Sequence, residues 1–281
     1  MVDIHVIQGG LGNQMFQYAH YLARKSMYPC AITLFDTHYC SGAHQGFELN
    51  RLFNLSCYHL SKKGLDIVFG IENAILCSKL RKHIWKRMFV YPEKNAWGYE
   101  EEAIAIKKSC VFEGYWQTDK YFKDIENVVR QEFGFNEKFV NHKSLQIAAE
   151  MHEKKGGYVS VHIRRGDYLQ ISNGAAVLPL SYYHNAIEIM NKKVTDPVFV
   201  FFSDDMKWVM ENIHVTNAIY IDWNTGKDSW MDMYLMSKCN HNIIANSTFS
   251  WWGAWLNANP GKIVISPVWS GDIIPNDWIQ I

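Results

Sequence analysis

The sequence predicts an α/β protein with two parallel-sheet domains. Short apolar runs rich in β-branched residues alternate with segments of helical periodicity, which is typical of parallel sheets covered by helices. Glycine-rich or polar turns follow several of these runs, where parallel strands place ligand-binding residues. The chain has 281 residues, which is enough for two such domains.

Composition excludes several classes of protein. Lysine plus arginine equals aspartate plus glutamate at 28 each, a balance that argues against a nucleic-acid partner. No pair of the six cysteines has the C-x-x-C spacing of a zinc or redox motif. No apolar run is long enough for a membrane span, and no signal peptide is recognisable, so we expect a cytoplasmic protein. The eleven tryptophans are expected mainly in the core, although indole faces also stack on sugars.

The first half begins with the apolar run at 3–8, expected to be a strand, and the turn GGLG. Apolar residues then recur at helical spacing over 13–28, and strands are expected at 30–35 and 110–116. Between them, residues 78–88 form a basic amphipathic pattern. This pattern fits either a solvated helix or a helix that holds the protein peripherally at the inner membrane face.

The second half shows five apolar runs separated by helix-like segments: 158–163, 197–202, 218–223, 241–246 and 262–267. The polar stretch at 136–157, which ends in EKKGG, is expected to be a linker. We therefore expect one Rossmann-like domain over 1–145 and another over 146–281.

The turn GGLGNQ, residues 9–14, suits either a structural turn or a phosphate site at a helix N-terminus. Gly10 and Gly12 fit the dinucleotide fingerprint G-x-G-x-x-G, and Asp36 fits its ribose-binding acid, but Met15 replaces the third glycine. The neighbouring amides of Asn13 and Gln14 favour a polar ligand that extends beyond a phosphate, such as a sugar.

The motif YVSVHIRRGDY, residues 158–168, places Ser160, His162 and Arg164 on one face of an apolar strand. A guanidinium at the carboxyl end of that strand can clamp a diphosphate. Asp167 is then a candidate general base, and an internal ion pair with an arginine is the alternative.

Two further motifs follow strands. In FFSDD, Asp204 suits hydrogen bonds from ribose or guanine, whereas capping of a helix by Asp204 or Asp205 is the structural alternative. In NSTFSWWGAWL, residues 246–256, small polar side chains open a predicted helix and offer donors to phosphate oxygens. No D-x-D triplet occurs, so no metal site is expected.

Taken in order, GGLGNQMFQYA, HIRRGDY, FSDD and NSTFSWWGAW resemble glycosyltransferase family 11, the α-1,2-fucosyltransferases, in its bacterial form. The resemblance implies a GT-B fold, with two Rossmann-like domains facing across a cleft. The acceptor side would lie in 1–145 and the GDP-fucose site in 146–281. It also implies inverting transfer of L-fucose to the 2-hydroxyl of a terminal galactose, on an oligosaccharide or lipid-linked glycan, with no metal or other cofactor.

The resemblance further implies roles for individual residues. Arg164 would bind the β-phosphate with His162 beside it, and Asn13 would approach the donor. The full set of expected donor-binding residues is Gly10, Gly12, Asn13, Gln14, His162, Arg164, Asp204, Asn246, Ser247, Thr248 and Phe249. The expected catalytic residues are Arg164, Asp167 and Asn13.

Some alternatives stay open on the sequence. Glu48, Glu113 or a histidine are candidates for the general base besides Asp167. A nicotinamide (NAD)-dependent oxidoreductase would use Gly10, Gly12 and Asp36, and a non-catalytic glycan-binding protein would use the aromatic residues.

Overall fold

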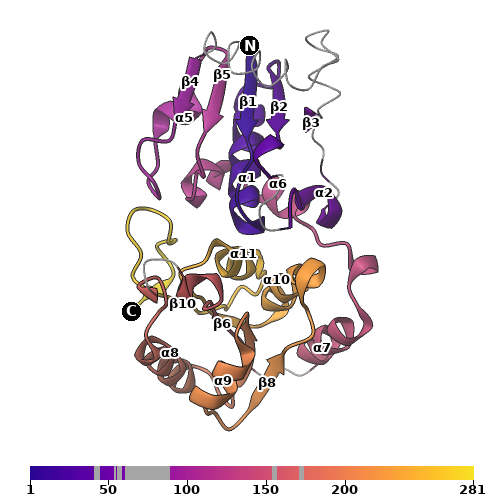
Figure 1. The fold of residues 1–281 in the computed structure, drawn as a ribbon, viewed down its shortest axis with the longest axis vertical. Coiled ribbons are helices and arrows are strands. Elements are labelled where there is room, and N and C mark those ends of the chain that lie inside the picture. Colours follow the sequence, from indigo (N-terminus) through magenta and orange to yellow (C-terminus); the bar gives the residue numbers. More distant parts are fainter. Residues whose placement is uncertain (41–44, 54, 56–58, 61–88, 154–156, 171–173) are drawn as a thin grey trace. The chain divides into compact units, whose positions relative to one another are not determined.

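The computed structural model describes residues 1–281 except 41–44, 54, 56–58, 61–88, 154–156 and 171–173 (Figure 1). The chain forms two compact units, which are described separately. Met1–Gly134 and Ser270–Pro275 make up the first unit, and Phe135–Trp269 and Asn276–Ile281 make up the second. The basic pattern at 78–88 lies outside the described residues.

The first unit contains a parallel sheet in the order β3-β2-β1-β5-β4. Its strands are β1 (Val2–Val6), β2 (Ile32–Asp36), β3 (His59–Leu60), β4 (Phe89–Pro92) and β5 (Cys110–Glu113). Its helices are α1 (Leu11–Met27), α2 (Leu49–Leu52), α5 (Glu101–Ala105) and α6 (Glu126–Glu132), and its short 3-10 turns are η1 (His38–Cys40), η2 (Asp119–Tyr121) and η3 (Lys123–Ile125).

Side chains of β1 alternate between two environments, as a strand requires. Ile4 and Val6 form an apolar cluster with Val111 of β5 on one face. Asp3 and His5, both buried, point to the other face, where they contact α1. The polar residues of this central strand therefore need partners from α1.

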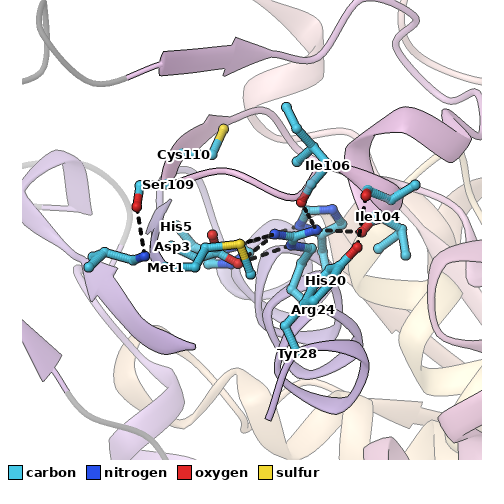
Figure 2. Close-up of polar contacts among 12 residues, drawn as sticks. Met1, Asp3, His5, His20, Arg24, Tyr28, Ile104, Ile106, Ser109 and Cys110 are labelled. Atoms are coloured by element: carbon cyan, nitrogen blue, oxygen red, sulfur yellow. Dashed lines mark hydrogen bonds and ion pairs between the residues drawn. The ribbon is translucent and has the colours of Figure 1, made fainter. Parts of the chain in front are cut away.

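Arg24 of α1 supplies the charge that Asp3 needs (Figure 2). Its Nε and Nη2 atoms donate to Asp3 Oδ2 at 3.0 and 2.8 Å, and both side chains are fully buried. Its Nη1 atom donates to the carbonyls of Ile104, within α5, and of Ile106, which directly follows this helix. One guanidinium thus joins α1 to β1 and to a segment about eighty residues away along the chain.

His5 and His20 form a second buried polar contact on the same face. Their Nδ1 atoms lie 3.4 Å apart, so one ring donates to the other. Burial lowers the pKa of both imidazoles well below the ordinary value, and the nearby positive charge of Arg24 adds to this effect. The pair is therefore neutral, and it packs among aromatic rings, with His20 stacked on Trp116 at 4.4 Å between ring centroids.

Residues 270–275 return to the first unit from late in the sequence. The backbone carbonyl of Asp272 accepts a hydrogen bond from Thr118 Oγ1 at 2.8 Å, and its carboxylate pairs with Lys120 at 2.6 Å. The same carboxylate accepts from the amide of Tyr99. This segment therefore fastens the loop that follows β5.

The second unit contains a parallel sheet in the order β11-β10-β9-β6-β7-β8. Its strands are β6 (Tyr158–Ile163), β7 (Val198–Ser203), β8 (Ala218–Ile221), β9 (His241–Ile243), β10 (Val264–Ser266) and β11 (Ile279–Gln280). Its helices are α7 (His142–Glu153), α8 (Leu180–Lys193), α9 (Met206–Asn212), α10 (Trp230–Lys238) and α11 (Thr248–Leu256), and its 3-10 turns are η4 (Glu137–Phe139), η5 (Asp167–Leu169) and η7 (Gly226–Asp228).

The two faces of the second sheet are covered differently. Val159, Val161 and Ile163 of β6 join one apolar cluster with residues of α8 and α9. Ser160 points the other way, and Asn242 of β9 donates to its hydroxyl at 2.7 Å. Helices α10 and α11 contact each other, and Asn242 Nδ2 also donates to Met236 O of α10. The predicted α/β class with two parallel sheets is confirmed.

The expected linker is instead largely helix α7, and the boundary expected after residue 145 falls inside it. Asn141 starts this helix by accepting a hydrogen bond from the amide of Ser144 at 2.8 Å. Ser144, Ala148 and Met151 are buried along one side. The sequence pattern did not reveal this helix, because the stretch is polar in composition and only one narrow face of the helix is buried.

No helix within the described ranges is long and apolar enough to cross a membrane.

We predict that Arg24→Met lowers the free energy of unfolding by about 3–5 kcal/mol, because it leaves Asp3 buried without its cation. Urea denaturation followed by tryptophan fluorescence measures the change. Arg130→Met is the control: its pair with Glu126 is partly exposed, and we expect a change below about 0.5 kcal/mol.

The double variant Arg24→Met/Asp3→Leu separates charge from packing. Removing both charges leaves no uncompensated ion, so most of the lost stability should return. A double variant as unstable as the single one would show that the guanidinium acts by packing alone.

Candidate active site

The carboxyl ends of β6, β7 and β9 bring together most residues predicted from the motifs of the second half. Neighbouring parallel strands end at the same edge of a sheet, and β6 lies between β7 and β9. The loops after these three strands carry Arg164, Asp204 and Asn246. His162 is the penultimate residue of β6.

Arg164 is held between two carboxylates. Its Nη2 atom lies 2.8 Å from Asp167 Oδ1 and its Nη1 atom 2.9 Å from Asp204 Oδ2. The arginine side chain is 30% exposed, so it is oriented by these partners and still accessible. The ion pair that the sequence left as an alternative is therefore present, and it fixes the guanidinium at the edge of the sheet.

Asp204 uses both of its oxygens within the protein. Oδ2 accepts from Arg164, and Oδ1 accepts from the backbone amide of Arg165 at 2.8 Å. Gly166 permits this approach, because a Cβ atom there would lie 2.7 Å from Asp204 Oδ2. In the structure the carboxylate of Asp204 orients the loop that carries Arg164, and its predicted contact with ribose or guanine stays a prediction.

Asp205 has the helix-capping role that the FFSDD motif offered as the structural alternative. Its Oδ1 atom accepts from the amide of Trp208 at 3.3 Å, which caps α9, and Oδ2 pairs with Arg165 Nε at 3.0 Å. The guanidinium of Arg165 also lies over the ring of Trp208, 3.9 Å from its centroid. Arg165 therefore secures α9 and leaves Arg164 as the arginine at the candidate site.

His162 has a buried nitrogen without a hydrogen-bond partner. The residue is 6% exposed, and its Nδ1 atom makes no hydrogen bond within the protein. Burial lowers the pKa of His162 to about 4, with a further contribution from Arg164 and an opposing one from Asp204. A neutral imidazole with an unpaired buried atom is the kind of group that a ligand completes.

The N-terminus of α11 lies beside His162, whose ring centroid is 5.8 Å from that of Phe249. Ser247 caps the helix, its Oγ atom accepting from the amide of Phe249 at 3.3 Å. Thr248 is the first helical residue. This helix end offers backbone amides and a positive dipole to an anion.

Asn246 connects the same helix end to the loop after β6. Its carbonyl accepts from the hydroxyl of Tyr168 at 3.0 Å, and its Nδ2 atom donates to Ala176 O at 2.9 Å. Its Oδ1 atom is buried and has no partner. The second unit thus presents two buried unpaired polar atoms near one arginine and one helix N-terminus, which suits an anionic ligand with additional polar groups.

The first unit places its glycine-rich turn directly after β1. Gly9 adopts φ +78°, a left-handed conformation that favours glycine. Gly10 is the residue before α1 and Gly12 is buried in its first turn. The helix therefore begins two residues earlier than the sequence predicted, at Leu11.

Asn13 and Gln14 have different environments. Asn13 Oδ1 accepts from Gln117 Nε2 at 2.8 Å. Gln14 was expected to bind ligand, but its side chain is fully buried and braces the turn: Nε2 donates to the carbonyls of Gly9 and Gly46, and Oε1 accepts from the amide of Glu48. Gln14 shapes the turn and leaves Asn13 as its candidate ligand group.

Glu48 and Glu93 of the first unit both have raised pKa values. Burial raises the pKa of Glu48, and the partner Arg51 Nη2, 3.1 Å away, opposes this shift. Burial also raises the pKa of Glu93, whose carboxylate accepts from the amides of Tyr115 and Trp116. A raised pKa suits a general base, which leaves Glu48 a candidate beside Asp167.

Gln117 and Glu93 belong to none of the sequence motifs. Their sequence signal was weak: each follows a strand of the first sheet, at its carboxyl edge, within an aromatic-rich loop. Within the described ranges, no three histidine, cysteine or acidic side chains gather as a metal-binding group.

Solved structures have a similar fold. Fucosyltransferase NodZ from Bradyrhizobium is 10% identical, with 90% of this chain and 91% of that chain covered and a TM-score of 0.51. A NodZ α-1,6-fucosyltransferase co-crystallised with GDP has a TM-score of 0.50 at 11% identity, covering 90% of this chain and 91% of that chain. The fold is therefore of the GT-B class of glycosyltransferases.

Sequence comparison gives the family. The family model described as "Glycosyl transferase family 11" matches residues 91–276, and the chain belongs to this family. It is 33% identical to the O-antigen biosynthesis glycosyltransferase WbnK of Escherichia coli, covering 93% of this chain and 92% of that protein. It is 30% identical to an α-1,2-colitosyltransferase of Escherichia coli over 98% of this chain and 97% of that protein. A galactoside α-(1,2)-fucosyltransferase 1 of Bos taurus is 26% identical over 89% of this chain and 64% of that protein.

Lys262 secures the other end of α11. Its Nζ atom donates to the carbonyls of Ala254, Trp255 and Asn257 at 2.8, 3.3 and 3.0 Å. A cation at this position satisfies the last carbonyls of the helix and complements its dipole.

We predict that Lys262→Met lowers the free energy of unfolding by about 1.5–3 kcal/mol, the range for charge-assisted hydrogen bonds. Lys207→Met is the matched control, because Lys207 is 87% exposed and 3.9 Å from Glu211. We expect it to change stability by less than about 0.5 kcal/mol. Equal shifts in the urea midpoints of the two variants would exclude a capping role for Lys262.

Proposed function

We propose that this protein transfers L-fucose from GDP-fucose to the 2-hydroxyl of a terminal galactose, with inversion at the anomeric carbon and without a metal ion. Membership in glycosyl transferase family 11 supports a glycosyl transfer. Relatives named as α-1,2-fucosyltransferase and α-1,2-colitosyltransferase support the linkage. The NodZ α-1,6-fucosyltransferase that was co-crystallised with GDP supports a GDP-activated donor. The family also favours this activity over the NAD-dependent oxidoreductase and the non-catalytic glycan-binding protein.

The single observation that carries the donor site is the unpaired buried Nδ1 atom of His162 beside Arg164 and the N-terminus of α11. A guanidinium, a helix end and an imidazole together suit a diphosphate. We therefore assign the donor to the second unit, with Asn246, Ser247, Thr248 and Phe249 lining the helix side. The acceptor is assigned to the first unit.

The proposed reaction is a single displacement. The 2-hydroxyl oxygen of galactose attacks C1 of fucose, and the bond from C1 to the β-phosphate oxygen breaks. GDP leaves with the bonding electron pair, and the hydroxyl proton passes to a carboxylate. Negative charge grows on the leaving phosphate, where Arg164 donates.

Asp167 and Asp204 orient Arg164 before the donor arrives. Two carboxylates hold the guanidinium in one orientation and leave its side chain partly exposed, so the donor meets a preorganised cation. Asp167 is also a candidate base, since only its Oδ1 atom pairs with Arg164 and its side chain is 47% exposed. Glu48 is the candidate base of the first unit, where we assign Asn13 a contact with a substrate oxygen.

A second donor sugar has a specific observation in its favour. The α-1,2-colitosyltransferase matches nearly the whole chain at 30% identity. Colitose is the 3-deoxy counterpart of fucose, so a site that hydrogen-bonds the 3-hydroxyl discriminates strongly between the two donors. The ratio of kcat/KM for GDP-fucose and GDP-colitose, with one galactoside acceptor, decides between them.

We predict that GDP binds to the purified protein in the presence of EDTA, with an affinity unchanged by added Mg²⁺. Isothermal titration calorimetry measures both, with NAD as a parallel ligand. The proposed donor site offers the guanidinium of Arg164 and the backbone amides at the start of α11, so no metal is needed to hold the diphosphate. Binding of NAD without binding of GDP would overturn the proposal, and binding only with Mg²⁺ would overturn its metal independence.

We predict that Arg164→Ala lowers kcat by about 10²–10³-fold with the fold intact, because the leaving phosphate loses its main donor. Arg164→Lys keeps the positive charge but not the paired N–H donors of the guanidinium, so it should recover only part of the rate. Arg130→Ala, at a partly exposed pair in the first unit, is the control. Near-normal turnover by Arg164→Ala would exclude this role, and full activity of Asp167→Asn would remove Asp167 as the base.

A further inference from the structure

We propose that Gln117 is a positioning residue that fixes the side-chain amide of Asn13 and thereby sets which group Asn13 presents to the substrate. This inference rests on the proposed contact of Asn13 with a substrate oxygen. Gln117 itself acts only through Asn13.

The contact between the two amides is direct. Gln117 Nε2 donates to Asn13 Oδ1 at 2.8 Å, from a side chain that is 7% exposed. Asn13 lies in the first turn of α1, whereas Gln117 lies in the loop after β5. Because β1 and β5 are neighbouring parallel strands, both residues sit at the carboxyl edge of the first sheet.

The opposite side of the Asn13 amide is also defined. A Cβ atom placed on Gly9 would lie 2.7 Å from Asn13 Nδ2, so the amino group lies over the glycine-rich turn. Oδ1 therefore points to Gln117, and Nδ2 points to the turn where helix α1 begins. In this orientation Asn13 presents a donor on the side of the helix N-terminus.

The backbone of Gln117 is held rigidly enough for this task. Glu93 accepts from the amides of Tyr115 and Trp116 at 2.8 and 3.0 Å, and Trp116 has φ +55°. The indole of Trp116 stacks on His20 of α1 at 4.4 Å. Thr118, on the other side of Gln117, is bonded to the carbonyl of Asp272. The loop is therefore fixed on both sides of the glutamine.

This arrangement matters because an amide has two different faces. Ring and glycosidic oxygens of a sugar substrate only accept hydrogen bonds, so they need the amino face of Asn13. A rotation of the amide by half a turn would present its oxygen, which repels such acceptors. Gln117 prevents that rotation by donating to Oδ1.

The test is a double-mutant cycle measured as kcat/KM for transfer from the GDP-sugar donor that the wild-type protein uses. Asn13→Ala should lower kcat/KM by about 10²-fold, the effect of one lost donor. Gln117→Met, which keeps the shape without the donor, should lower it by about tenfold, a coupling typical of contacting residues. In the Asn13→Ala background, Gln117→Met should change kcat/KM by less than about twofold.

Gln117→Glu is the sharper variant. A carboxylate only accepts, so Asn13 must turn its amino group toward residue 117 and its oxygen toward the substrate. We expect kcat/KM to fall to the level of Asn13→Ala. Gln131→Glu and Gln131→Met, at an exposed position of the same unit, are the matched controls and should leave kcat/KM unchanged.

Three kinetic outcomes overturn the inference. Unchanged kcat/KM in Gln117→Met and Gln117→Glu, with a defect in Asn13→Ala, would leave the proposed function intact and remove Gln117. Equal losses from Gln117→Met in both backgrounds would show that Gln117 acts independently of Asn13. Normal kcat/KM in Asn13→Ala would remove the substrate contact on which the inference rests.

A nuclear magnetic resonance measurement tests the contact between Gln117 and Asn13 without enzyme turnover. It therefore distinguishes failure of this inference from failure of the proposed function. In protein labelled with ¹⁵N-glutamine, Gln117→Met identifies the side-chain resonances of Gln117 by their loss. Asn13→Ala should shift one of these two N–H resonances. Resonances that stay in place would show that Gln117 does not donate to Asn13.

Discussion

A buried positive charge must be neutralised, and in the first unit this constraint organises the elements around α1. Arg24 meets it with the carboxylate of Asp3 on the central strand and with two carbonyls at the C-terminal end of α5. The guanidinium therefore fixes the helix along the sheet, and with it the point where the helix begins. The glycine-rich turn and Asn13 lie at the carboxyl edge because they follow β1, and this contact near the other end of α1 holds the helix against the sheet.

The two units prepare their polar groups by the same physical means. In the second unit, Asp167 and Asp204 orient the guanidinium of Arg164. In the first unit, Glu93 holds backbone amides of the loop after β5, and Gln117 in that loop holds the amide of Asn13. In each case an accessible donor is fixed by buried or half-buried partners, so it needs little reorganisation when charge develops near it.

The sequence predicted most of the second unit because its signals are local. The alternating pattern of residues 158–163 matched β6 residue for residue, and its polar face and the position of Arg164 followed from strand geometry alone. The hydrogen-bond partners of the site residues were harder to predict from the sequence. Gln14 and Asn13 are adjacent amides in one motif, and only contacts with distant residues, Gly46 and Gln117, distinguish the structural amide of Gln14 from the candidate ligand amide of Asn13. Helix α7 was missed for the same reason, since its narrow buried face can be recognised only from its packing against α10.

The return of residues 270–275 to the first unit has a consequence for biosynthesis. Asp272 completes the hydrogen bonding of Thr118 and the amide of Tyr99, so both wait for a segment that leaves the ribosome after nearly all of the second unit. Domains usually fold in the order in which they are made. Here the unit whose synthesis begins first is completed only after nearly all of the second unit has been made, and the loop that carries Gln117 gains this support only then.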